Sequence, residues 1–182
     1  MSDTRTRELE RRWRETSAGA DRLAYASELK RAGRYEDIAR VYQPILEETP
    51  STHQEYLRVS PLTEKDTRNL EELIQHQPLQ GMRIWHIGSS VVRPDYNDVD
   101  LLIEINYLNF DVADFQIAIQ NNISQFSIDS VQGPYPQIVR PGYAQHGNLA
   151  LRIQGTYKET HFDLCMIPHV QFNDERFRMR LR

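Results

Sequence analysis

The sequence predicts an α+β protein in which a mixed β-sheet flanked by helices follows an N-terminal all-α helical region. Apolar residues recur at helical spacing through the first third of the chain. From residue 84 onward, short apolar segments instead alternate with polar residues at the period of two that is typical of strands. A helical pattern between two of these segments supplies a crossover, which a parallel pair of strands requires.

The composition is that of a globular protein, because 39% of the 182 residues are hydrophobic and 26% are charged. The longest apolar runs are too short to cross a bilayer, and the first residues include no apolar segment for secretion. We therefore expect a cytoplasmic protein without a membrane partner. A single cysteine excludes an internal disulfide, and a net charge of -4 without a polybasic face makes a long nucleic-acid duplex the least natural substrate.

Residues 1–60 are expected to form an N-terminal helical domain. The segment 29–39 resembles the turn of one tetratricopeptide helical hairpin, although no second copy follows at the required period. We favour a hairpin that packs on the rest of the protein over a groove for a protein partner, and both interpretations stay open. Breaks at Pro50 and Pro61 place the domain boundary near Pro61, so that 61–182 form the second domain.

The second domain is expected to begin with a helix capped by Thr63 and Asp66, which leads into a strand at 84–87. Apolar residues four apart predict a further helix over 112–126, followed by a short strand at 127–131. An irregular, proline- and glycine-rich loop follows at 133–147; it either borders a ligand site or is a surface excursion. The remaining expected elements are a strand at 149–153, a turn at 155–159 and a strand at 161–167.

Two aspartates lie at the start of an expected strand that begins near residue 98. Asp98 and Asp100 point to the same face, because successive side chains on a strand alternate, while Val99 and Leu101 point into the core. Two like charges this close raise each other's pKa unless a cation lies between them. Carboxylate oxygens in such a pair suit magnesium or manganese.

A third aspartate has the same setting near the end of the chain. Asp163 alternates with Phe162 and Leu164, so it falls on the face opposite these apolar residues and is placed to reach the same metal from a neighbouring strand. Ahead of the aspartate pair, Gly88, Ser89 and Ser90 form a turn whose backbone N–H groups and hydroxyls suit a nucleotide phosphate.

These motifs resemble those of the nucleotidyltransferases of the DNA polymerase beta superfamily, in particular the minimal nucleotidyltransferases. The family's pattern is an apolar strand, Gly-Ser, a spacer, Asp-x-Asp on the next strand and a third Asp on a later strand. The resemblance covers about 62–167 and no part of the N-terminal third. The family usually has a short helix with a basic residue after Gly-Ser; the segment from Val91 to Pro94 leaves little room for one, and Arg93 is the candidate for the basic role.

The resemblance implies the nucleotidyltransferase fold and a metal-dependent transfer of a nucleoside monophosphate, with release of pyrophosphate. In that interpretation Asp98, Asp100 and Asp163 are catalytic and bind two Mg²⁺ or Mn²⁺ ions. The nucleotide, ATP or another nucleoside triphosphate, is bound by the residues after the first strand: Gly88, Ser89, Ser90 and Arg93. The acceptor hydroxyl stays open between a protein, a tRNA end and a small molecule.

A non-enzymatic interpretation also accounts for the sequence. The fold would then be an inactive binding or assembly module whose N-terminal helices contact a partner, and the aspartates would only bind a nucleotide or an ion. The presence of all three carboxylates favours the enzyme.

Overall fold

The computed structural model describes residues 2–46, 50–105, 112–133 and 151–168. The chain divides into two compact units, one formed by Met1–Thr67 with Ser90–Asp95 and the other by Arg68–Ser89 with Tyr96–Arg182. The first segment of the first unit ends at Thr67, inside a helix. We expected the domain boundary a few residues earlier, near Pro61. That boundary stays a prediction.

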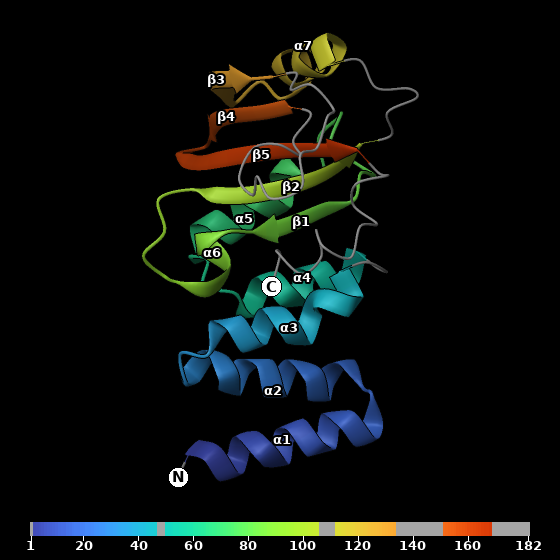
Figure 1. Cartoon of the computed structure of the whole chain (residues 1–182), viewed down its shortest axis with the longest axis vertical. Coiled ribbons are helices and arrows are strands. Elements are labelled where there is room, and N and C mark those ends of the chain that lie inside the picture. Colours follow the sequence, from blue (N-terminus) through green and yellow to red (C-terminus); the bar gives the residue numbers. More distant parts are fainter. Residues whose placement is uncertain (1, 47–49, 106–111, 134–150, 169–182) are drawn as a thin grey trace, which may run out of the picture. The chain divides into compact units, whose positions relative to one another are not determined.

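Four helices lie wholly within the first unit: α1 (Ser2–Thr16), α2 (Gly19–Arg31), α3 (Tyr35–Leu46) and α4 (Pro50–Val59). Successive helices run back and forth against one another (Figure 1). Their facing sides bury apolar side chains, among them Leu29, Ile38, Tyr42 and Leu57. The turn between α2 and α3 closes at Gly33, whose φ of 70° is unfavourable for other residues, and the Arg34 N–H donates to the Leu29 carbonyl at 2.9 Å.

The second unit is built on a five-stranded sheet with the order β1-β2-β5-β4-β3 (Figure 1). The strands β2 and β5 are parallel, whereas the other three pairs are antiparallel. The expected α+β class, with a mixed sheet, flanking helices and N-terminal helices, is therefore confirmed. The strands are β1 (Ile84–Ile87), β2 (Val99–Ile105), β3 (Phe126–Gln132), β4 (Leu151–Tyr157) and β5 (Thr160–Pro168).

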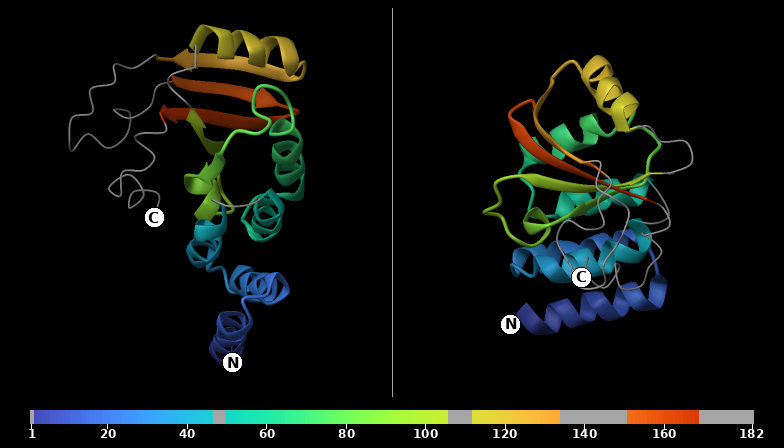
Figure 2. Two further views of the ribbon diagram at one scale, coloured as in Figure 1. Left: turned by 90° about the vertical axis from the view of Figure 1, so that its right-hand side faces the viewer. Right: turned by 45° about the horizontal axis from the view of Figure 1, so that its top comes forward.

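Two helices accompany the sheet, α5 (Glu64–Leu73) and α7 (Val112–Asn122). Figure 2 shows α7 along β3. The C-terminal half of α5 is tied to the turn between β4 and β5, because the Asn69 side-chain amide donates to the Lys158 carbonyl at 2.9 Å and to Thr160 Oγ1 at 2.8 Å. The expected cap of α5 is also present: the Asp66 N–H donates to Thr63 Oγ1 at 3.1 Å.

Three local expectations were wrong. The helix expected to reach residue 126 ends at Asn122, because Phe126 instead begins β3 and packs on Gly155. The strand β4 continues through Gly155, where a turn was expected, and the turn is limited to Lys158 and Glu159. The segment after Gly88 does form a short helix, α6 (Ser89–Val92), for which we had expected little room.

No helix in the described ranges has the length and apolar character needed to span a membrane. Residues 134–150, which hold most of the expected irregular loop and the start of the expected strand at 149–153, lie outside the described part of the chain.

Candidate metal centre

Asp98 and Asp100 lie at the start of β2, an interior strand that pairs with β1 on one side and with β5 on the other. The alternate positions Val99, Leu101 and Ile103 are fully buried. Asp100 therefore projects from the opposite face, where it is half-buried, and Asp98 immediately precedes the strand and is also half-buried.

Asp163 is brought beside Asp100 by the parallel pairing of β5 with β2. The two residues are register partners, and side chains at paired positions of adjacent strands project from the same face. Phe162 and Leu164 fill the other face and are buried. Asp163 itself is only 1% exposed, which is unusual for a carboxylate.

The three carboxylates form one cluster. One oxygen from each of Asp98, Asp100 and Asp163 lies within 4.8 Å of the others. Two ligands on opposite sides of one Mg²⁺ are about 4.2 Å apart, so this spread is close to the span that the ligands of one ion cover. The side chains that the sequence singled out as metal ligands are thus brought together by the fold.

The electrostatics of the cluster act most strongly on Asp100. Burial, together with the negative charges of Asp98 and Asp163, raises the pKa of Asp100 to about 7. The positive charge of Arg152 instead lowers the pKa of Asp100. A cation at this position would relieve the repulsion and favour the ionised form of Asp100.

Arg152 is the residue of the cluster that sequence reasoning missed. Its Nε donates to Asp163 Oδ1 at 2.9 Å and Oδ2 at 2.7 Å, and its Nη2 also donates to Oδ2. The hydrogen bonds to Asp163 raise the pKa of Arg152 further above its usual value. The sequence does hold a signal, since Arg152 alternates with buried Leu151 and Ile153, but only the hairpin register brings it next to Asp163.

Cys165 completes the surroundings of Asp163 on the same face of β5. Burial raises the pKa of its thiol, so the sulfur keeps its proton, and Sγ lies 3.5 Å from Asp163 Oδ1 as a weak donor.

Gly88 approaches the cluster from the end of β1, at the turn where a phosphate contact was expected. Its φ is 77°, and a β-carbon at this position would lie 2.7 Å from Asp100 Cγ and still closer to Oδ2. Only glycine leaves room for the Asp100 carboxylate here. Ser89, the next residue, is half-buried and opens α6.

The other two expected nucleotide contacts belong to the first unit. Ser90 is fully buried and Arg93 is exposed. The structure groups both with the helical unit, and their role as phosphate contacts stays a prediction.

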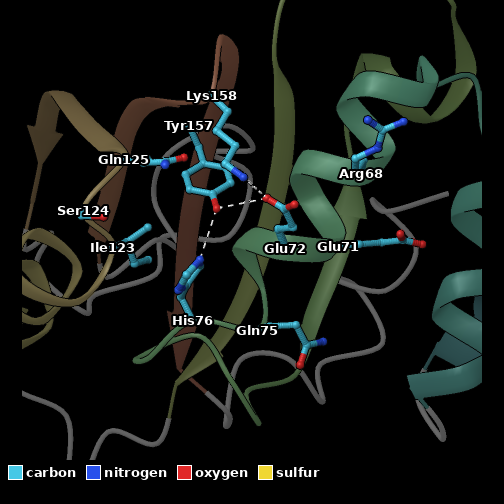
Figure 3. A pocket seen from close by; sticks show the side chains of 10 residues that line it. All are labelled: Arg68, Glu71, Glu72, Gln75, His76, Ile123, Ser124, Gln125, Tyr157 and Lys158. Carbon is cyan, nitrogen blue, oxygen red and sulfur yellow. Dashed lines mark hydrogen bonds and ion pairs between the residues drawn. The ribbon is translucent and has the colours of Figure 1, made fainter.

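A cavity of about 520 Å³ lies in the second unit on the other face of the sheet (Figure 3). Tyr157, on the helix-covered side of β4, donates to Glu72 Oε2 at 3.4 Å and lies 3.2 Å from His76 Nε2, and Lys158 pairs with the same Glu72 carboxylate. Figure 3 shows these four side chains converging on one wall. The cluster of aspartates does not line this cavity. The contacts of Glu72 with Tyr157 and Lys158 instead explain how α5 is held against the hairpin of β4 and β5.

Comparisons with protein-family models and with curated proteins find no match for this sequence. The resemblance to nucleotidyltransferases therefore rests on the motif residues and on their spacing.

Proposed function

We propose that the protein is a metal-dependent nucleotidyltransferase with the fold of the DNA polymerase beta superfamily. It would transfer a nucleoside monophosphate from a nucleoside triphosphate to an acceptor hydroxyl and release pyrophosphate. The observation that carries the proposal is the meeting of Asp98, Asp100 and Asp163 on one face of the sheet, beside the Gly88 turn.

The residues present fit a divalent cation. All three side chains offer hard oxygen ligands, and the raised pKa of Asp100 reflects its burial together with the negative charges of Asp98 and Asp163, which Arg152 only partly compensates. Asp98, Asp100 and Asp163 would hold Mg²⁺ or Mn²⁺, two ions in the full complex. When bound, the metal would neutralise the triphosphate and make the acceptor hydroxyl easier to deprotonate.

The chain's own groups have distinct roles in this proposal. The acceptor oxygen attacks the α-phosphorus, the bond to the bridging oxygen of pyrophosphate breaks, and the hydroxyl proton passes to Asp163 or to water. In the ion-free protein, Arg152 holds the Asp163 carboxylate in one orientation through both of its oxygens. Backbone N–H groups around Gly88 and the Ser89 hydroxyl are candidate contacts for the phosphates.

A second function is supported by the ion pair of Arg152 with Asp163. This pair already compensates one of the three carboxylates, so the cluster can also be interpreted as a nucleotide- or ion-binding site without transfer activity. The helices of the first unit would then be the surface for a protein partner. Only a transfer assay separates the two functions.

The test is incubation of the full chain with each nucleoside triphosphate, labelled on the α-phosphate, in the presence of Mg²⁺ or Mn²⁺. Cell RNA, cell protein and small-molecule extracts are offered separately, which also identifies the class of acceptor. Label should reach one of these fractions with the parent and not with Asp100→Asn. The matched control is Glu104→Gln, because Glu104 lies on the same face of β2 as Asp100 but about 13 Å further along the strand. Label on nothing, with pyrophosphate unreleased, would favour the binding module.

A further inference from the structure

Arg152 and Asp163 form a two-point ion pair inside the candidate metal centre. Three donor contacts join the guanidinium to both carboxylate oxygens, two of them at 2.7 Å and 2.9 Å. A fork of this kind uses the in-plane lone pairs of a carboxylate. A metal ion binds a carboxylate through the same lone pairs, so the two cations compete for the same positions.

The exposure of the two partners differs. The Asp163 side chain is 1% exposed and is fixed on the central strand β5, whereas Arg152 is 21% exposed. If one of them moves when an ion binds, it is Arg152, because its long side chain can turn toward solvent.

Stability alone does not explain why a half-buried arginine is paired with Asp163 here. A buried ion pair loses much of its attraction to desolvation, and apolar residues of similar volume are often as good or better. The pair does have an electrostatic effect on its neighbours: Arg152 lies close enough to Asp100 to lower the pKa that burial and the other aspartates raise. It thus compensates one of the three negative charges and leaves two for an ion.

We propose that Arg152 is the resident counter-cation of the aspartate centre, which holds Asp163 while no divalent ion is bound and competes with the ion for that carboxylate. The inference rests on the proposed function, since it takes Asp98, Asp100 and Asp163 to be metal ligands. Arg152 is then a positioning residue that sets the ion affinity of the nucleotide-free protein and keeps Asp163 oriented until an ion arrives.

The experiment compares Mn²⁺ binding to the parent and to Arg152→Gln by isothermal titration calorimetry at pH 8, without nucleotide, after treatment with chelator. Loss of one positive charge beside the site should tighten Mn²⁺ binding by roughly tenfold or more. The control is Arg83→Gln, which removes another arginine paired with a carboxylate, that of Glu104, at 3.4 Å in the same unit. The control should bind Mn²⁺ as the parent does.

Thermal melting supplies a readout that does not depend on calorimetry. With chelator, Arg152→Gln should melt below the parent, because the carboxylates lose their compensating charge. Saturating Mn²⁺ should raise its melting temperature by more than it raises that of the parent. Should Arg152→Gln fail to fold, Arg152→Lys keeps the charge without the fork, and its Mn²⁺ affinity should lie between the parental value and a tenfold tighter one.

Unchanged or weaker Mn²⁺ binding to both Arg152 variants would overturn the inference and leave Arg152 as a structural partner of Asp163. Absence of Mn²⁺ binding to parent and variants alike would overturn it as well. These results are separate from the transfer assay: Mn²⁺ binding that is abolished by Asp100→Asn, without any nucleotide transfer, counts against the proposed function and not against competition at Asp163.

Discussion

Gly88 lies so close to Asp100 that the β-carbon of any other residue at this position would overlap the Asp100 carboxylate. The contact joins the turn after β1 to the second residue of β2, and the two strands pair with Ile87 opposite Asp100. Gly88 lies directly against the Asp100 carboxylate. A substitution at Gly88 therefore tests the geometry of the centre without removing a ligand.

Gly88→Ala should destabilise the protein and weaken its response to Mg²⁺. The positive φ alone costs on the order of 1 kcal/mol, and the overlap with Asp100 adds about 1–3 kcal/mol of strain. Gly81→Ala is the matched control, because Gly81 has a similar φ of 82° with open space around the added carbon. Urea denaturation of both variants, with chelator and with Mg²⁺, measures the difference. Equal losses in the two variants would show that the Asp100 carboxylate simply moves aside.

Asp100→Asn should remove a pH-dependent loss of stability. The folded-state pKa of about 7 lies above the unfolded value of 3.8, so the folded protein keeps a proton that the unfolded chain has released. In the ion-free parent this group contributes nothing below pH 4, destabilises progressively between pH 4 and 7, and has its full effect above pH 7. With allowance for screening at a half-buried site, the effect is about 1–3 kcal/mol.

Chemical denaturation in chelator at pH 8 should therefore find Asp100→Asn as stable as the parent or more so. Saturating Mg²⁺ should reverse the order, because the parent has the complete ligand set and gains more from the ion. Transfer activity should fall by orders of magnitude in the same variant. A variant that keeps parental transfer would exclude Asp100 as an essential ligand.

His53 in the first unit should show the opposite dependence in the same pH range. It is buried, its Nε2 has no hydrogen-bond partner among the described residues, and burial lowers its pKa to about 4. The unfolded chain takes up a proton near pH 6.5 and the folded protein does not, so stability contributed by neutral His53 is lost as the pH falls from 6.5 to 4. His53→Leu should remove about 2–3 kcal/mol of this acid sensitivity.

The measurement is denaturation at pH 4.5 and 7.5 for the parent, His53→Leu and Asp100→Asn. The parent should change little, because the two groups oppose each other, whereas His53→Leu should be relatively more stable at pH 4.5 and Asp100→Asn relatively more stable at pH 7.5. The same pH profile in all three proteins would contradict both assignments.

Asn69→Ala should weaken the attachment of α5 to the hairpin between β4 and β5. The amide is buried and makes two hydrogen bonds, so its loss leaves the Lys158 carbonyl and the Thr160 hydroxyl short of a donor and costs about 1–3 kcal/mol. Gln77→Ala removes an exposed amide hydrogen bond to Gln80 and should stay within about 0.5 kcal/mol of the parent. Melting temperatures of the two variants give the comparison. A loss as small in Asn69→Ala as in Gln77→Ala would show that the turn is held by its other contacts.

The parts of the fold that sequence reasoning predicted are those set by local pattern. The alternation around Asp100 and Asp163 placed both carboxylates on the face opposite their apolar neighbours, as the structure has them. Thr63 and Asp66 predicted the cap of α5 because a capping motif is contained within four residues.

The parts that it did not predict depend on contacts between distant segments. Phe126 continues an apolar helical pattern, yet it belongs to a strand because Gly155, on another strand, leaves space for its ring. The alternation of Arg152 with apolar residues gives only its face of the strand, and the register of β4 with β5 is what places its guanidinium on Asp163. Neither contact is visible from the spacing of residues within one element.

The hairpin of β4 and β5 also bears on the order in which the centre assembles. Arg152 and Asp163 are 11 positions apart and joined by a short turn, whereas Asp100 precedes Asp163 by more than sixty residues. Short hairpins close within microseconds, and pairings between remote segments are slower. Asp163 would thus already be paired with Arg152 when the hairpin pairs with β2. The negative charge of Asp163 would then be compensated as it approaches Asp100 during this slower step.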